Sequence, residues 1–346
     1  MKRLVDRLKT ERMLPGDGFA ELLTCLDAEA VGYLYESAVE TRRGVYGRDI
    51  YIRGLIEFTN HCKNDCYYCG IRRSNTNARR FRLSAGEILN CCDKGYDLGF
   101  RTFVLQGGED PFFTDDRLCE IIKSIKSRHQ DCAVTLSIGE RSRESYQALF
   151  NAGADRYLLR HETANGTHYG RLHPCGMSLE SRIRCLYDLK EIGYQTGCGF
   201  MVGSPCQTVE NLIEDLMFIH DFHPQMVGIG PFIPHRDTPF RSESAGSMEL
   251  TLRLLAIIRL MLPDVLLPAT TALGTIAPRG RELGIMAGAN VVMPNLSPIG
   301  AREKYLLYDG KLHTGAEAAE SLAVLKQSME SIGYSIVTSR GDHKAE

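Results

Sequence analysis

The stretch at 51–69, "YIRGLIEFTNHCKNDCYYC", places an apolar run directly before three closely spaced cysteines. Its first nine residues are rich in Ile, Leu, Phe and Tyr, the composition of a buried β-strand. Further strand-like runs follow, separated by amphipathic helix-like runs, at 101–106, 132–138, 156–162, 196–202, 226–232, 266–272 and 289–295. Continuous apolar strands that alternate with helices indicate a parallel sheet covered by helices on its outer face.

Eight βα units predict an α/β fold, a complete (β/α)8 barrel of the TIM type at 51–311. We expect a helical extension at 1–50 and a C-terminal helix with a frayed tail at 312–346. The alternative is an open doubly wound sheet. Polar residues follow nearly every strand, and a barrel would gather these loops at one mouth, so the barrel is favoured. "SAGE" (84–87) fits a capping box, and "TVEN" (208–211) opens with a hydroxyl residue suited to a helix N-cap.

Composition narrows the class of protein. The chain has 346 residues, a formal charge of −2 and a pI near 6.6, which argues against a nucleic-acid-binding surface. It has no run of 18 apolar residues, and its N-terminus lacks the apolar core of a signal peptide, so we expect a cytoplasmic protein without a membrane span. Six of its twelve cysteines are predicted to be small buried hydrophobes: Cys25, Cys91, Cys92, Cys119, Cys132 and Cys185.

The cysteines at 62, 66 and 69 form a C-x3-C-x2-C spacing, unlike the two close doublets of a zinc ribbon. Three thiolates on one loop can bind three irons of a 4Fe–4S cluster, whereas an electron-transfer cluster normally has a fourth Cys. The remaining iron would be an open Lewis-acid site. The alternatives are unliganded thiols or a zinc site completed by His61.

The triplet, its position after the first strand and the aromatic Tyr68 resemble the radical S-adenosylmethionine (SAM) superfamily. In that superfamily SAM chelates the open iron, and an electron from the cluster cleaves it to methionine and a 5′-deoxyadenosyl radical. From about residue 50 to 310, the segments "VLQGGEDP", "GADRYLLRHETAN", "MVGIGPFIPHRDTP" and "PATTALGTI" resemble more closely the HydE family of FeFe-hydrogenase maturases.

The resemblance implies a role for individual residues. It assigns the cluster to Cys62, Cys66 and Cys69. It places around SAM the residues Tyr68, Gly107, Gly108, Glu109, Glu162, Arg182, Met201 and Ile229. It places in the substrate cavity the residues Thr135, Arg160, Thr270, Thr271, Met293 and Tyr308.

The residues themselves leave alternatives open. Arg160 and Glu162 follow the fourth strand and would be costly to bury unpaired, so a purely structural ion pair is possible, with His161 on the opposite face. Arg182 could hold a carboxylate through two hydrogen bonds or lie on a solvated helix face. The glycines of "QGGED" permit close backbone approach but also suit an ordinary loop.

The family resemblance implies an iron substrate with cysteine, carbonyl and cyanide ligands, delivered by a partner maturase, and an electron donor such as ferredoxin or flavodoxin. One alternative is a radical SAM enzyme acting on a small organic acid or amino acid, like biotin synthase or methylornithine synthase. Another is a non-catalytic iron–sulfur scaffold or redox sensor.

The chain also departs from the family pattern. The family segment "QSGED" is "QGGED" here, and "GLPGQT" is "GSPCQT", which introduces Cys206. Cys175 lies in another mouth loop, and an incidental loop thiol is the favoured interpretation of Cys206. No Cys follows Cys206, so the second, C-terminal cluster of some family members cannot form there.

Overall fold

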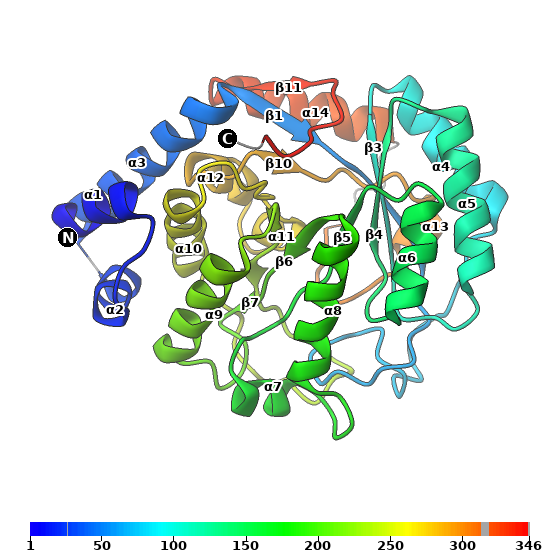
Figure 1. Cartoon of the computed structure of the whole chain (residues 1–346), viewed down its shortest axis with the longest axis horizontal. Helices are drawn as coiled ribbons and strands as arrows, with labels where there is room; N and C mark the ends of the chain where they lie inside the picture. Colours follow the sequence, from blue (N-terminus) through cyan, green and yellow to red (C-terminus); the bar gives the residue numbers. More distant parts are fainter. Residues whose placement is uncertain (26, 313–317, 345–346) are drawn as a thin grey trace.

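Helices form the first part of the chain, up to the strand that begins at Asp49. A computed structural model describes residues 1–25, 27–312 and 318–344. Its first helices are α1 (Lys2–Glu11), α2 (Gly16–Thr24) and α3 (Ala28–Tyr46). They lie against the outer helices α9 (Val209–Phe222) and α10 (Met248–Met261), at one side of the molecule (Figure 1).

A parallel sheet of six strands is the centre of the fold and confirms the α/β prediction. Its order is β2 (Gly54–Thr59), β3 (Thr102–Gly107), β4 (Ala133–Ser137), β5 (Arg156–Leu158), β6 (Gln195–Cys198) and β8 (Met226–Val227). The helices that follow these strands cover the outer face (Figure 1): α4 (Ala85–Asp97), α5 (Asp115–Arg128), α6 (Arg143–Asn151), α8 (Leu179–Ile192) and α9. Both predicted helix starts are confirmed, because capping boxes join Ser84 to Glu87 and Thr208 to Asn211.

Two shorter sheets continue the strand order. The predicted strand at 51–59 is interrupted at Arg53, so that it forms the end of β1 (Asp49–Ile52) and the whole of β2. The strand β1 pairs in parallel with β10 (Val291–Val292) and with β11 (Ser335–Val337). The strands β7 (Met201–Val202) and β9 (Gly230–Pro231) form a separate pair. Single parallel pairings connect the remaining segments: Met226 with Leu266, Pro268 with Val291, and Leu55 with Asn295.

The predicted strand at 266–272 is wrong at its C-terminal end. Only Leu266 and Pro268 make strand-like pairings, and Thr271 already begins α11 (Thr271–Ile276). Pro268 has no N–H to donate, so a sheet ladder is weakened at this position. Thr270 and Thr271 therefore lie at a helix start and not in a strand. The remaining helices are α7 (Gly166–Leu172), α12 (Gly280–Met286), α13 (Ile299–Arg302) and α14 (Ala318–Ser331).

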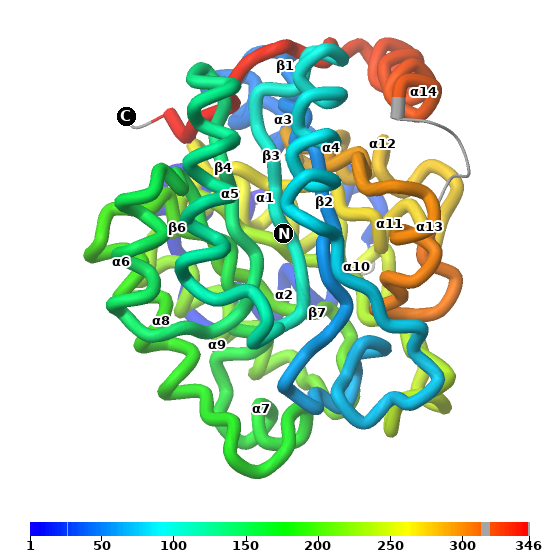
Figure 2. The backbone as a smooth tube through the Cα atoms, turned by 90° about the vertical axis from the view of Figure 1, so that its right-hand side faces the viewer, coloured from blue at the N-terminus to red at the C-terminus, as the bar shows by residue number. Residues whose placement is uncertain are grey.

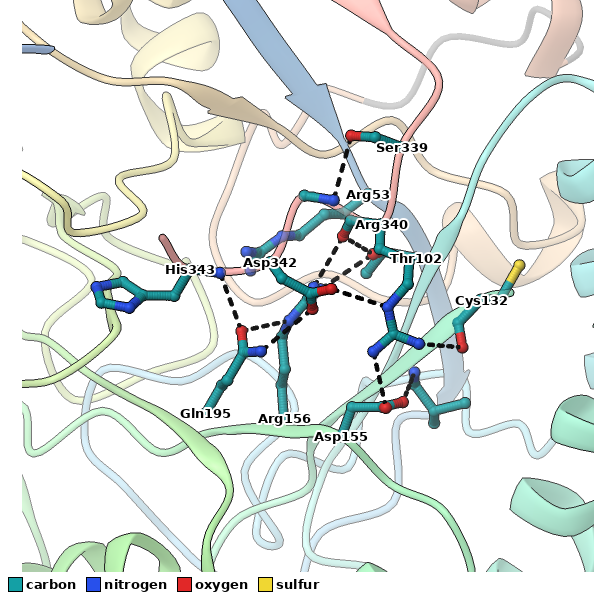
Figure 3. Close-up of polar contacts among 12 residues, drawn as sticks. Arg53, Thr102, Cys132, Asp155, Arg156, Gln195, Ser339, Arg340, Asp342 and His343 are labelled. Carbon is teal, nitrogen blue, oxygen red and sulfur yellow. Dashed lines mark hydrogen bonds and ion pairs between the residues drawn. The ribbon is translucent and has the colours of Figure 1, made fainter. Parts of the chain in front are cut away.

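Residues 335–343 of the predicted frayed tail are held against the sheet, contrary to expectation. After α14, β11 joins β1, and residues 339–343 cross the N-terminal ends of the sheet strands (Figure 3). Asp342 contacts the fully buried Arg156 at 2.5 Å, and Arg340 contacts Asp155 at 3.0 Å. A buried guanidinium needs a counter-charge, and here the tail supplies it. The two last residues of the predicted tail, 345–346, and the segment 313–317 lie outside the described residues.

The two ends of the sheet therefore differ. Figure 2 shows β1, β11 and α14 at one end, while α7 and the blue segment that follows β2 lie at the other, where the strands end. Four of the six cysteines predicted to be buried are buried: Cys91, Cys92, Cys132 and Cys185. The other two are partly exposed: Cys25, which follows the last residue of α2, and Cys119, which lies within α5. No helix among the described residues combines the length and apolarity needed to cross a membrane.

Candidate functional site

The three predicted cluster cysteines lie on the irregular segment after β2. Backbone hydrogen bonds tie this segment to three distant parts of the chain: Lys63 N–H donates to Glu109 at 2.9 Å, Tyr67 N–H to Leu172 at 3.0 Å, and Gly70 N–H to Leu307 at 2.8 Å. The guanidinium of Arg80 donates to main-chain carbonyls within it, at Asn60, Ile71, Arg72 and Asn75. These bonds fix a loop that has no regular structure of its own.

The thiols are close enough to affect one another electrostatically. Burial raises the pKa of Cys66 to about 12, with a further increase from the neighbouring Cys62. Burial also raises the pKa of Cys69, to which Cys66 and Cys62 again contribute. Bound iron would favour the thiolates and reverse these effects, so the donor set suits a cluster. No three His, Cys, Asp or Glu side chains of the described residues surround a single metal-ion position.

The glycine turn at the end of β3 lies directly against the cysteine loop. A Cβ at Gly108 would be 2.3 Å from the carbonyl oxygen of His61 and 2.7 Å from the Cβ of Cys62. Separations this short are not possible for real side chains, so the approach of β3 to the loop requires glycine. The adjacent Gly107 is similarly restricted, since its Cβ would lie 2.7 Å from Thr59 Cγ2.

Glu109 connects this turn to the next strand. Its Oε2 lies 3.2 Å from Lys63 Nζ, and its Oε1 accepts the N–H of Glu140 at 3.0 Å. Glu140 follows β4, and its Oε1 lies 2.8 Å from Arg182 Nε. A chain of polar contacts therefore runs from the cysteine loop to α8.

Arg182 is buried, with a side chain only 8% exposed, so the solvated helix face is excluded for it. Burial opposes its charge, but Tyr169, Glu140 and Tyr68 act in the other direction and raise its pKa. Tyr68 donates its hydroxyl proton toward Nε2 of His173 at 3.2 Å, because the other ring nitrogen contacts the Tyr169 carbonyl. Burial lowers the pKa of His173 to about 4, so this ring is neutral at pH 7.

Arg160 and Glu162 form an ion pair at 2.7 Å, one of the arrangements expected from the sequence. The pair leaves Nε of Arg160 buried without a hydrogen-bond partner among the described residues. The hydroxyls of Thr135 and Thr270 are also buried and have no hydrogen-bond partner among the residues that the structure describes. Each of these three atoms could bind a polar ligand, because an unpartnered polar atom is costly to bury.

The other predicted residues occupy distinct places. Met201 packs with Leu172 and Phe232, and Tyr68 lies against this cluster. Ile229 is fully buried beside β9, and burial raises the pKa of Tyr308 to about 12. Thr271 and Met293 line a cavity of about 440 Å³ between α11, α12 and α14, together with Lys311. None of the other predicted site residues lines this cavity.

Sequence reasoning missed Lys63, Glu140 and His173 as parts of the site. "SIGER" marked a polar loop after the third predicted strand, but nothing in it distinguished Glu140. His173 precedes a proline, which gives no sign of its contact with Tyr68, 105 residues earlier. Each of these three residues contacts a side chain that is distant in sequence, so the local sequence does not show the contact.

A parallel α/β fold with three cysteines on the loop after β2 defines the class, which is that of the radical SAM enzymes. The family model described as the Radical SAM superfamily matches residues 56–219. The "[FeFe] hydrogenase maturase subunit HydE" of Thermotoga maritima is 46% identical over 300 residues, covering 87% of this chain and 85% of that protein. The chain belongs to the HydE family of radical SAM enzymes, and membership of this superfamily implies a 4Fe–4S cluster and SAM.

More distant relatives share the fold. The 3-methylornithine synthase of Methanosarcina acetivorans is 29% identical over 301 residues, covering 86% of this chain and 84% of that protein. The crystal structure of methylornithine synthase (PylB) has a TM-score of 0.83 at 25% identity and covers 96% of this chain and 97% of that one.

Proposed function

We propose that Cys62, Cys66 and Cys69 each bind one iron of a 4Fe–4S cluster and that SAM binds the fourth iron. When bound, the cluster supplies the electron that cleaves SAM to methionine and a 5′-deoxyadenosyl radical. The observation that carries this proposal is the single loop with three cysteines within eight residues, fixed against the glycine turn of β3. We further infer that the single pairings around Leu266, Pro268 and Asn295 close the sheet into a complete eight-stranded barrel.

The chain itself holds and orients SAM in this proposal. Arg182 and Glu162 are electrostatic neighbours of Tyr68, which immediately precedes Cys69. The guanidinium would bind the carboxylate of SAM, and the carboxylates of Glu109 and Glu162 would accept hydrogen bonds from its ammonium or ribose groups. Gly107 and Gly108 admit the ligand closely, while Met201 and Ile229 supply apolar contact. The enclosing strands would keep water away from the radical.

The substrate in this proposal is a cysteine-ligated iron carbonyl cyanide complex, the precursor of the diiron subcluster of FeFe hydrogenase. Its anionic groups suit the unpartnered Nε of Arg160 and the hydroxyls of Thr135 and Thr270. Thr271, Met293 and Tyr308 would complete the wall. Other maturases would deliver and receive the complex, with a ferredoxin or flavodoxin as electron donor, in the cytoplasm.

Complementation of a host that makes FeFe hydrogenase tests this proposal. A strain lacking its own HydE should regain hydrogenase activity when it expresses this chain, and should not when it expresses the Cys66→Ala variant. No recovery with a well-expressed, cluster-loaded wild-type protein would contradict the maturase function.

A second candidate is a radical SAM enzyme that acts on a small amino acid or organic acid. The observation in its favour is the likeness to methylornithine synthase over nearly the whole chain. Incubation with SAM, dithionite and each of the common amino acids in turn separates the two. The maturase proposal predicts no product that depends on any of these amino acids, whereas formation of 3-methylornithine would establish the second candidate.

A further inference from the structure

Glu162 has a backbone conformation that non-glycine residues rarely adopt. Its φ is 68°, in the left-handed region. Its N–H donates to the carbonyl of Gly199 at 3.0 Å, and the residue forms an isolated parallel pairing with Phe200. Such conformations persist when the surrounding structure imposes them, so contacts outside Glu162 must hold it there.

The preceding residue, His161, provides the first of these contacts. Its side chain points to the opposite face from Glu162 and is fully buried, with its ring 4.7 Å from that of Phe218 in α9. Its Nδ1 accepts the N–H of Gly199 at 3.2 Å. Because Nδ1 is an acceptor, the neutral ring carries its proton on Nε2.

Asp215 of α9 provides the second contact. Its Oδ1 lies 3.3 Å from His161 Nε2 and accepts the N–H of Ala164 at 2.5 Å. The Asp215 side chain is fully buried, as is that of His161. One carboxylate therefore contacts the chain on both sides of Glu162. It accepts a hydrogen bond from the backbone two residues after Glu162, and it lies in ion-pair range of the ring of the residue before it, whose Nε2 has no other hydrogen-bond partner among the described residues.

We propose that Asp215 is a positioning residue for SAM, acting through His161 and Ala164 to hold Glu162 in its left-handed conformation. This inference rests on the proposed role of Glu162 in binding SAM. Asp215 lies on the helix side of the sheet and acts without touching the ligand. Removal of its carboxylate frees the segment 160–164, which lets Glu162 relax and turn its side chain away from the site.

Substitutions at position 215 separate hydrogen bonding from charge. Asp215→Leu keeps the branching at Cγ but has a larger side chain that cannot accept a hydrogen bond. Asp215→Asn retains one acceptor oxygen that can serve both Ala164 and His161. We expect the Leu variant to bind SAM at least tenfold more weakly than wild type, and the Asn variant to stay within about threefold.

The readout is SAM affinity, titrated on the anaerobic holoenzyme from the change that SAM causes in the EPR spectrum of the reduced cluster. Iron content and the SAM-free spectrum should remain those of the wild type, which a general loss of structure would not allow. The matched control is Glu214→Leu on the same helix. Glu214 accepts from Asn165 at 3.0 Å and has no contact with Glu162, so this variant should stay within twofold of wild type.

Wild-type affinity in Asp215→Leu would overturn the inference, and so would an equal loss in Glu214→Leu. Should Asp215→Leu fail to fold, His161→Asn replaces it. That variant keeps an acceptor for Gly199 but cannot reach Asp215, so it should also weaken SAM binding, and unchanged affinity would again overturn the inference. Glu162→Gln separates this inference from the proposed function: unchanged SAM binding in that variant would refute the assignment of Glu162 itself.

Discussion

At the scale of single residues, the proposed chemistry depends on three thiols whose ionised form is disfavoured by their surroundings. Burial raises the pKa of Cys62, Cys66 and Cys69, and each negative charge would make the next harder to form. A cluster of positive metal ions removes both penalties at once. The segment therefore gains more from iron than an exposed set of thiols would.

Cys66→Ala should lose cluster iron and SAM cleavage together. Two protein ligands hold a cluster weakly, because every ligand contributes to its retention. Iron analysis and the yield of 5′-deoxyadenosine measure the two effects. The control is Cys175→Ala, which removes an exposed thiol. Full iron content in Cys66→Ala would contradict the ligand assignment.

Local spacing singled out the cysteines as candidate ligands, whereas the residues that contact Tyr68 and the segment around Glu162 could not be predicted. The C-x3-C-x2-C pattern is complete within eight residues of sequence. By contrast, Asp215 meets Ala164 across 51 positions, and His173 meets Tyr68 across 105. A single sequence shows the first kind of arrangement directly and contains no local sign of the second.

At the scale of elements, glycine decides how closely the strands and loops approach. A Cβ at Gly199 would lie 2.1 Å from the carbonyl oxygen of Gly228, at the points where β6 and β8 end. Beyond this point β7 and β9 form a pair separate from the six-stranded sheet, although the sequence predicted continuous strands at 196–202 and 226–232. Apolar composition predicted where strands lie, but it did not show these interruptions.

Gly108→Ala should impair cluster assembly. The added methyl group collides with the main chain of His61, so the cysteine loop must move away from β3. We expect iron content after anaerobic reconstitution to fall by half or more. Gly32→Ala in α3 is the control: it meets nothing within 4 Å and should stabilise the helix by up to ~1 kcal/mol. Normal iron content in Gly108→Ala would show that the loop is not held in this way.

At the scale of the whole molecule, the two ends of the sheet have different roles. The strand ends near α7 carry the proposed chemistry, and the opposite end is closed by the C-terminal residues (Figure 3). Arg340 donates to both Asp155 and Asp342, and Thr102 donates to the Arg340 carbonyl at 2.7 Å. Charge and helix-like composition near the C-terminus suggested a loose tail. The prediction failed because the contacts that hold the tail span more than 180 residues and cannot be recognised from local sequence.

The tail should make stability depend on acid pH. Burial of Asp342 opposes ionisation, but Arg340 and Arg156 outweigh it and lower its pKa from 3.8 to about 2. A lowered pKa in the folded state gives stability that is present above pH 4 and lost as the pH falls through the interval from 4 to 2. Because the carboxylate is 38% exposed, we reduce the expected contribution to roughly 1 kcal/mol.

Urea unfolding of the cluster-free protein at pH 6 and at pH 3 measures this effect. Wild type should lose more free energy of unfolding between the two pH values than Asp342→Asn does, while at pH 6 the variant should be less stable. Equal losses in the two proteins would show that the tail carboxylate does not contribute through its charge.

The most direct test of the central claim is the EPR spectrum of anaerobically prepared, dithionite-reduced protein, recorded with and without SAM. We predict a 4Fe–4S signal that changes when SAM is added, because in the proposed site SAM would coordinate the iron that has no cysteine. A sample that binds zinc instead, or a cluster whose signal is the same with and without SAM, would contradict the account.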